Sequence, residues 1–77
     1  MDIIEAIQQA ESGKLITNNF LKINDYFLKY IKNGVFAQYK IINKKAVYCY
    51  EVRNFSYAEC ISIGWEVLTE NYFINEN

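Results

Sequence analysis

The hydrophobic pattern at the start of the chain is that of an amphipathic helix. Apolar side chains recur at helical spacing, at Ile3, Ile4, Ile7 and Ala10, with Ala6 beside them. Asp2 suits an N-cap, and Glu5 completes the D-x-x-E spacing of a capping box. Gly13 is placed to end the helix. We therefore predict a helix over residues 2–12 and a short strand over residues 14–17.

Two alternating runs, residues 26–32 and 35–42, predict a β-hairpin. Asn33-Gly34 between them favours a two-residue type I′ turn, since both turn positions need positive φ. Such a turn places Tyr30 opposite Ala37 and fixes which side chains share a face. The face expected to form the core holds Tyr26, Leu28, Tyr30, Ala37, Tyr39 and Ile41. The opposite face, called the mixed face below, holds Phe27, Lys29, Ile31, Phe36, Gln38 and Lys40.

A third strand follows the turn at residues 43–45. If the loop has an even number of residues, its core-facing set is Ala46, Tyr48, Tyr50 and Val52. The mixed face then gains Val47, Cys49, Glu51 and Arg53. An odd loop exchanges the two sets. We prefer the even loop because it places the charged residues with the other charges.

The last third predicts a short helix that leads into a final strand. Ser56 and Glu59 have the S-x-x-E spacing of a capping box, and Gly64 offers a left-handed stop. Residues 65–68 have the composition of a strand. The sequence therefore predicts one α+β domain over residues 1–77. Its N-terminal helix packs on a small, mainly antiparallel sheet of about five strands, with a short helix before the last strand.

The segment over residues 18–25 is the least regular, since its three Asn and one Asp favour turns. Phe20 within it is either packed into the core or exposed as a stacking platform for a ligand.

Composition predicts self-association. The 77 residues are 52% hydrophobic and 17% aromatic, more than a small monomer easily hides, and a homo-oligomer interface would cover the excess. No apolar run approaches the roughly 20 residues of a membrane span. The acidic start lacks the positive charge of a signal peptide. We expect a cytoplasmic protein without membrane contact, in which Cys49 and Cys60 are free thiols unless geometry permits their pairing.

The charges are distributed unevenly. The net charge is −1, which argues against a general DNA-binding role. Residues 14–45 nevertheless contain seven lysines and one acidic residue. This basic segment either guards exposed strand edges or attracts a phosphate-bearing ligand.

The residue types indicate binding rather than catalysis. The chain has no histidine, which excludes His-based nucleophiles and metal sites, and two cysteines cannot complete a structural zinc site. No glycine-rich phosphate loop is present. We expect a protein without enzymatic activity, metal or cofactor. Phe27, Phe36, Lys29 and Arg53 on the mixed face can stack on bases and neutralise phosphates, or this face can be a subunit interface.

Two short motifs resemble the Thoeris anti-defence two family of small phage proteins. At the start, Ile3-Ile4-Glu5-Ala6-Ile7 and Glu11-Ser12-Gly13-Lys14 are similar to the family's "I-x-E-A-I…x-x-G-K". Near the end, Phe55-Ser56, the short helix and Gly64-Trp65-Glu66-Val67 resemble its closing "(D/G)-W-E-(V/I)" strand. The resemblance covers roughly residues 1–20 and 54–68.

The resemblance implies an immune-signal sponge. Proteins of this family bind cyclic ADP-ribose isomers, and some bind cyclic dinucleotides, without cleaving them. They assemble as homo-oligomers, typically tetramers, with pockets shared between protomers. The protein is thus expected in the cytoplasm of a bacterial host, where it would hold a cyclic nucleotide signal.

Carrying the family's pattern over gives candidate pocket residues and one departure. The family's basic residues after the first helix fall on Thr17 and Asn18, and its tryptophan falls on Phe20. An aromatic ring is kept, but the lost cations leave the ligand open. Asn18 and Asn19 either form the turn or hydrogen-bond to ribose or base edges. Trp65 matches the family's terminal tryptophan, and either lines the pocket or is buried.

A second hypothesis is a small inhibitor that binds a host defence protein directly, such as an anti-CRISPR. Its motivation is the small size, the aromatic content and the lost cations at Thr17 and Asn18.

Overall fold

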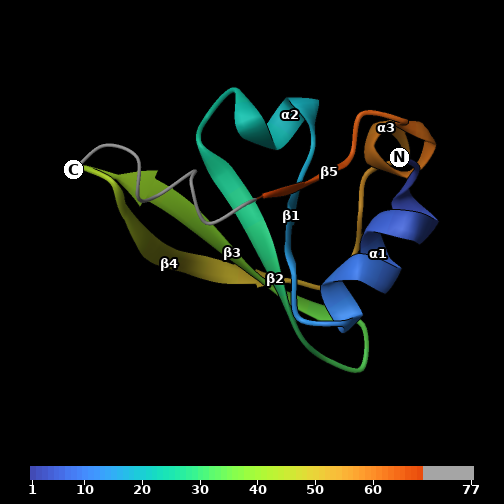
Figure 1. Cartoon of the computed structure of the whole chain (residues 1–77), viewed down its shortest axis with the longest axis horizontal. Helices are drawn as coiled ribbons and strands as arrows, with labels where there is room; N and C mark the ends of the chain where they lie inside the picture. Colours follow the sequence, from blue (N-terminus) through green and yellow to red (C-terminus); the bar gives the residue numbers. More distant parts are fainter. Residues whose placement is uncertain (69–77) are drawn as a thin grey trace.

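Residues 1–68 form a five-stranded antiparallel sheet with three helices (Figure 1). The computed structural model describes residues 1–68. The elements in chain order are α1 (Ile3–Glu11), β1 (Leu15–Thr17), α2 (Asn19–Lys22), β2 (Tyr26–Lys32), β3 (Val35–Ile42), β4 (Lys45–Val52), α3 (Tyr57–Ile61) and β5 (Glu66–Leu68). The sheet order is β4-β3-β2-β1-β5, and every pair is antiparallel. The predicted α+β fold, with a short helix before the last strand, is confirmed.

Helix α1 begins and ends as its sequence predicts. The Asp2 carboxylate accepts from the Glu5 backbone N–H at 2.9 Å, and the Glu5 carboxylate accepts from the Asp2 N–H at 3.3 Å. Gly13 ends the helix with φ +103°, a conformation that glycine adopts without a steric cost. The helix packs against β1, β2, β5 and α3. The buried core comprises Ala6, Ala10, Ile16, Leu21, Leu28, Phe36 and Trp65.

The predicted register of the first hairpin is wrong. Asn33 and Gly34 do form a two-residue turn with positive φ at both positions, and Lys32 pairs with Val35. Tyr30 then pairs with Phe36 rather than Ala37, because Ile31 is an extra residue in a β-bulge. One extra residue inverts every face assignment on β3.

The inversion moves β3 side chains between the two faces. Phe36, predicted on the mixed face, lies in the core, where its ring meets Tyr30 at 5.4 Å. Lys40, also predicted there, lies over the Tyr26 ring at 5.3 Å. Tyr39 moves the opposite way and stacks on Phe27.

A second bulge interrupts β4. Asn43 and Lys44 form a two-residue turn, so the preferred even loop is confirmed. However, Gln38 pairs with Tyr50 whereas Tyr39 pairs with Tyr48, which leaves Cys49 as the extra residue. The four residues predicted to face the core are therefore divided. Val52 packs against the core, whereas Tyr48 shares the face of Tyr39.

Helix α3 is capped as predicted but ends differently. Ser56 and Glu59 form the capping box. Gly64, however, does not adopt positive φ, and the helix ends at extended Ser62. A Cβ at Gly64 would collide with the Asn19 side-chain amide. The glycine thus allows the exposed Asn19 side chain of α2 to pack closely on the segment before β5, and a larger residue would require Asn19 to turn away.

None of the helices formed by residues 1–68 is long and apolar enough to cross a membrane.

Candidate functional site

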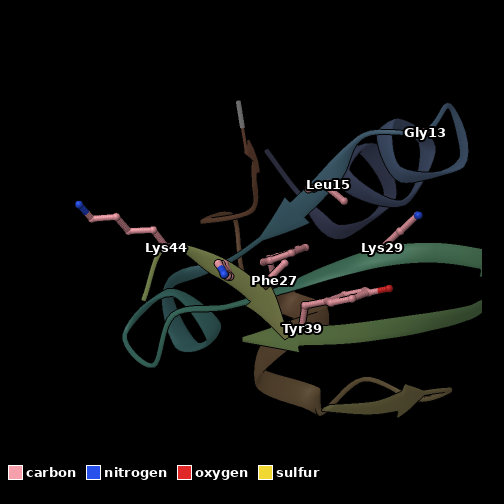
Figure 2. A pocket seen from close by; sticks show the side chains of 8 residues that line it. Gly13, Leu15, Phe27, Lys29, Tyr39 and Lys44 are labelled. Carbon is pink, nitrogen blue, oxygen red and sulfur yellow. The ribbon is translucent and has the colours of Figure 1, made fainter. Parts of the chain in front are cut away.

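The candidate site is an open hollow on the sheet face opposite α1. Ile16 and Leu28 point into the core beneath that helix. Their neighbours Leu15 and Phe27 point the other way, because side chains alternate along a strand. The hollow on this second face has a volume of about 590 Å³. The described residues that line it are Gly13, Leu15, Phe27, Lys29, Tyr39, Lys44, Lys45 and Ala46 (Figure 2). We call it the lysine-rimmed hollow.

Aromatic rings form the centre of the lysine-rimmed hollow. The Phe27 and Tyr39 rings stack with their centroids 5.3 Å apart and an interplanar angle of 8°. Tyr48 meets Tyr39 edge-on at 5.8 Å. Phe27 is only 2% exposed, whereas Tyr39 is half-buried and Tyr48 exposed. One face of the Tyr39 ring is covered by Phe27, and Tyr48 lies beside the hollow without lining it. The parts of these two rings that remain exposed offer an aromatic surface for a planar base.

Three lysines give the hollow its charge. Lys29 comes from β2, Lys44 from the β3–β4 turn and Lys45 from the start of β4, and all three are exposed. None of the described lining residues is acidic. Lysine ammonium groups bind phosphate oxygens through charge-assisted hydrogen bonds. An aromatic surface with cations around it is suited to a ligand that combines a planar ring with anionic groups.

Only part of the predicted site comes together here. Phe27 and Lys29 line the hollow. The prediction missed Tyr39, because the bulge at Ile31 was not anticipated. It also missed Lys44 and Lys45 as individual site residues. Their excess of positive charge was visible in the sequence, but they were assigned only to a turn.

Two predicted ligand-binding residues lie in the core instead. Phe36 is 1% exposed and Trp65 is 2% exposed. Phe55 lies edge-on to both rings, at 5.4 Å and 5.7 Å, and the indole N–H of Trp65 donates to the Glu59 carbonyl at 3.0 Å. These contacts occupy both side chains in packing α3 onto the sheet, so neither can contact a ligand in this arrangement.

The remaining candidates do not line the hollow either. Asn18 is fully buried and caps α2, where its side-chain oxygen accepts from the Leu21 N–H at 2.8 Å. Asn19 packs on Gly64. Phe20 on α2 is 51% exposed, so it is not a core residue. Arg53 is exposed and forms an ion pair with Glu51 at 2.9 Å.

Metal-binding groups are not gathered anywhere in residues 1–68. This part of the chain has no cluster of three or more His, Cys, Asp or Glu side chains. Cys49 and Cys60 are both free thiols.

Comparisons with protein-family models, with curated proteins and with solved structures found no match to this chain.

Proposed function

We propose that the protein binds and sequesters a cyclic nucleotide immune signal without degrading it. The signal would be a cyclic ADP-ribose isomer or a cyclic dinucleotide. The protein would act as a phage anti-defence protein in the cytoplasm of a bacterial host, and would assemble as a homo-oligomer, a tetramer as is typical of the family that it resembles.

The observation that supports this proposal is the lysine-rimmed hollow. Cyclic nucleotides of this kind combine purine rings with phosphates. Aromatic stacking contributes about 1–3 kcal/mol per base, and Tyr39 and Tyr48 offer such surfaces. Lys29, Lys44 and Lys45 supply the cations that phosphates require. The hollow lies within the size range of about 300–1,000 Å³ that is typical of small-ligand sites.

The proposal is tested by a thermal melt of the purified protein against cyclic ADP-ribose isomers, cyclic di-AMP and cyclic di-GMP. A ligand at a hundred times its Kd adds about 2.7 kcal/mol of stability. That should raise the Tm of a domain this size by about 10 °C or more. The bound ligand is then released by denaturation and identified by mass spectrometry. Indifference to every ligand, or recovery of a cleaved product, would contradict the proposal.

Oligomeric assembly is tested by light scattering on the same sample. The sponge hypothesis expects a stable oligomer in which a second protomer adds side chains to the open side of the hollow. Since the hollow is open, a second protomer would also remove a bound ligand from solvent. A strictly monomeric protein would exclude shared pockets.

Exposed apolar side chains support a second candidate function, that of an inhibitor that binds a host defence protein. Four large side chains from α1 and the α3 region are more than half exposed: Ile4 (65%), Tyr57 (79%), Ile61 (61%) and Ile63 (82%). We call them the α1–α3 patch. The two helices are in contact, and such patches are typical of protein–protein interfaces. A monomer that binds no cyclic nucleotide and inhibits a purified defence complex, with Ile61→Glu abolishing inhibition, would establish this alternative.

A further inference from the structure

The last strand ends at the rim of the lysine-rimmed hollow. Leu68, the final residue of β5, pairs with Leu15 of β1. Paired residues of neighbouring strands point to the same face of a sheet, and Leu15 is one of the residues that line the hollow, with Phe27 from β2 and Tyr39 from β3 (Figure 2). The chain that follows Leu68 therefore begins next to the candidate site.

Residues 69–77 have a composition that complements the hollow. They contain the apolar run Tyr72-Phe73-Ile74, with Glu70 before it and Glu76 after it, and they contain no lysine or arginine. The hollow has stacked aromatic rings at its centre and three lysines, and none of the described residues that line it is acidic. The segment and the hollow thus match in apolar surface and are opposite in charge, which is the complementarity expected of two surfaces that bind each other.

The segment is also long enough to cross the hollow. Neighbouring strands lie about 4.8 Å apart, so β3 is roughly 14 Å from β5, across β1 and β2. The five residues from Leu68 to Phe73 span up to about 17 Å when extended. The eight residues from Leu68 to Glu76 span up to about 27 Å, more than the roughly 19 Å from β5 to β4. Phe73 can therefore reach the aromatic centre, and Glu76 can reach the lysines at the β3–β4 end.

We propose that residues 69–77 bind in the lysine-rimmed hollow of their own chain. The apolar run Tyr72–Ile74 packs against the Phe27 and Tyr39 rings, and the two glutamates lie near the lysines of the rim. A segment tethered at Leu68 meets the hollow at an effective concentration in the roughly millimolar range. The tether favours this segment over the same segment of a second copy, which is present only at the ordinary protein concentration.

Docking of the segment has a consequence for ligand binding. The docking itself depends on no ligand, whereas its consequence rests on the proposed function. A cyclic nucleotide that binds in the hollow has to displace the segment, so its apparent affinity is reduced by the fraction of molecules whose hollow is open. Residues 69–77 would thus regulate access to the site.

Photo-crosslinking of the full chain locates the segment directly. Phe73 is replaced by p-benzoylphenylalanine, the protein is irradiated at high dilution, and mass spectrometry of the digest identifies the residues joined to the label. The proposal expects adducts within one chain, on peptides that carry Leu15, Phe27 or Tyr39. The same label in place of Tyr57, an exposed aromatic residue of the α1–α3 patch, is the matched control and should form no adduct with those peptides.

Three results of the crosslinking would overturn the proposal. Adducts on other parts of the chain would place the segment elsewhere. Adducts only between two chains would make a second copy the occupant of the hollow. The absence of any adduct would mean that residues 69–77 contact no part of the sheet.

The role of charge is tested in the same labelled chain. Glu70→Gln combined with Glu76→Gln removes both negative charges and keeps the size of the side chains. It should lower the yield of adducts in the hollow by about twofold at low salt, as expected for exposed ion pairs. The effect should be smaller at high salt because of screening. An unchanged yield at low salt would show that the lysines of the rim do not hold the segment.

Competition is tested with Tyr72→Ser combined with Phe73→Ser. This variant should bind cyclic di-AMP about three- to tenfold more tightly than the parent protein, because the hollow is open in a larger fraction of molecules. Tyr57→Ser, which also removes an exposed aromatic side chain, is the control and should bind as the parent does. Thermal melts without ligand confirm that each variant is folded.

The outcomes distinguish this inference from the proposed function. If the label at Phe73 reacts in the hollow and no cyclic nucleotide binds the parent or the serine variant, the sponge is overturned and the docking stands. If the parent binds cyclic di-AMP and the label reacts elsewhere, the docking is overturned and the sponge stands. If the label reacts in the hollow but the serine variant binds cyclic di-AMP no more tightly than the parent, the regulatory consequence is overturned.

Discussion

The two faces of the sheet are built from the same strands and have opposite properties. On the α1 face, the core side chains such as Leu28 and Phe36 are apolar and almost fully buried. On the opposite face, Phe27 and Tyr39 lie among three exposed lysines. Along one strand, alternate residues therefore pack in the core or line the candidate site. Substitutions on one face should therefore leave the properties of the other largely intact.

Two single-residue bulges decide which residue reaches which face. If Ile31 paired with Phe36 as in a regular hairpin, the alternation would have placed Phe36 on the face of Phe27 and Tyr39 on the face beneath α1. The bulge instead gives the core its large ring and the hollow its tyrosine. The candidate site therefore depends on an irregularity of the sheet as much as on the residues that line it.

The largest expected effect is on the α1 face, from Trp65→Ala. Truncation of a buried tryptophan costs about 3–5 kcal/mol, and Trp65 also loses its hydrogen bond to Glu59. Against a typical stability of roughly 5–15 kcal/mol for a whole domain, this removes a large fraction of the free energy of unfolding and should shift the urea midpoint strongly downward. Urea unfolding followed by circular dichroism measures the change.

Tyr57→Ala is the matched control for the tryptophan, because Tyr57 is also an aromatic residue near α3 but is 79% exposed. It should alter stability by no more than about 0.5 kcal/mol. Equal losses from the two variants would contradict the placement of Trp65 in the core.

A smaller loss is expected from Gly64→Ala, at the contact between α2 and the segment before β5. The added methyl group meets the Asn19 amide, but Asn19 is exposed and its side chain can turn away, so the cost should be at most about 1 kcal/mol. In an Asn19→Ala background this contact is absent, so the same substitution should cost less. Unfolding curves of the parent protein, the two single variants and the double variant complete this double-mutant cycle. If Gly64→Ala costs the same in both backgrounds, a backbone requirement of Gly64 is responsible instead.

The features predicted correctly from the sequence were local. The capping boxes at Asp2–Glu5 and Ser56–Glu59 each depend on four consecutive residues, and both form. The turn at Asn33–Gly34 is set by the conformational preferences of its own residues. Short-range chemistry of this kind can be read without knowledge of the rest of the chain.

The features predicted incorrectly depend on distant contacts. A bulge at Ile31 is favoured because it lets Phe36 join Tyr30 and Phe55 in the core, a gain that involves three separate elements. Gly64 was predicted to end the helix from its own residue type. Its contact with Asn19 could not be foreseen, because the two residues are 45 positions apart in the sequence. The error in the register of the hairpin also affected the predicted site. Phe27 and Lys29 were identified from β2, which kept its predicted faces, whereas Tyr39 on inverted β3 was missed.

On the hollow face, Tyr39→Leu should change binding more than stability. Loss of the ring stacked on Phe27 costs about 0.5–1.5 kcal/mol of stability. Loss of the stacking surface should weaken binding of a cyclic nucleotide by about 1–3 kcal/mol, roughly five- to 150-fold. Tyr57→Leu, on the α1–α3 patch, is the control and should leave binding unchanged. Unaltered affinity of Tyr39→Leu would mean that the ligand does not stack in the hollow.

The smallest effect on stability, and the sharpest contrast between the faces, is expected from Lys29→Gln. Substitution of an exposed lysine changes the free energy of unfolding by no more than about 0.5 kcal/mol, so the unfolding curve should not move. Ligand affinity should fall by up to about fivefold at low salt. Lys32→Gln, also an exposed lysine of β2 but not a residue lining the hollow, should have little effect. If both variants weaken binding equally, the ligand responds to the general positive charge of residues 14–45, and the hollow is not its site.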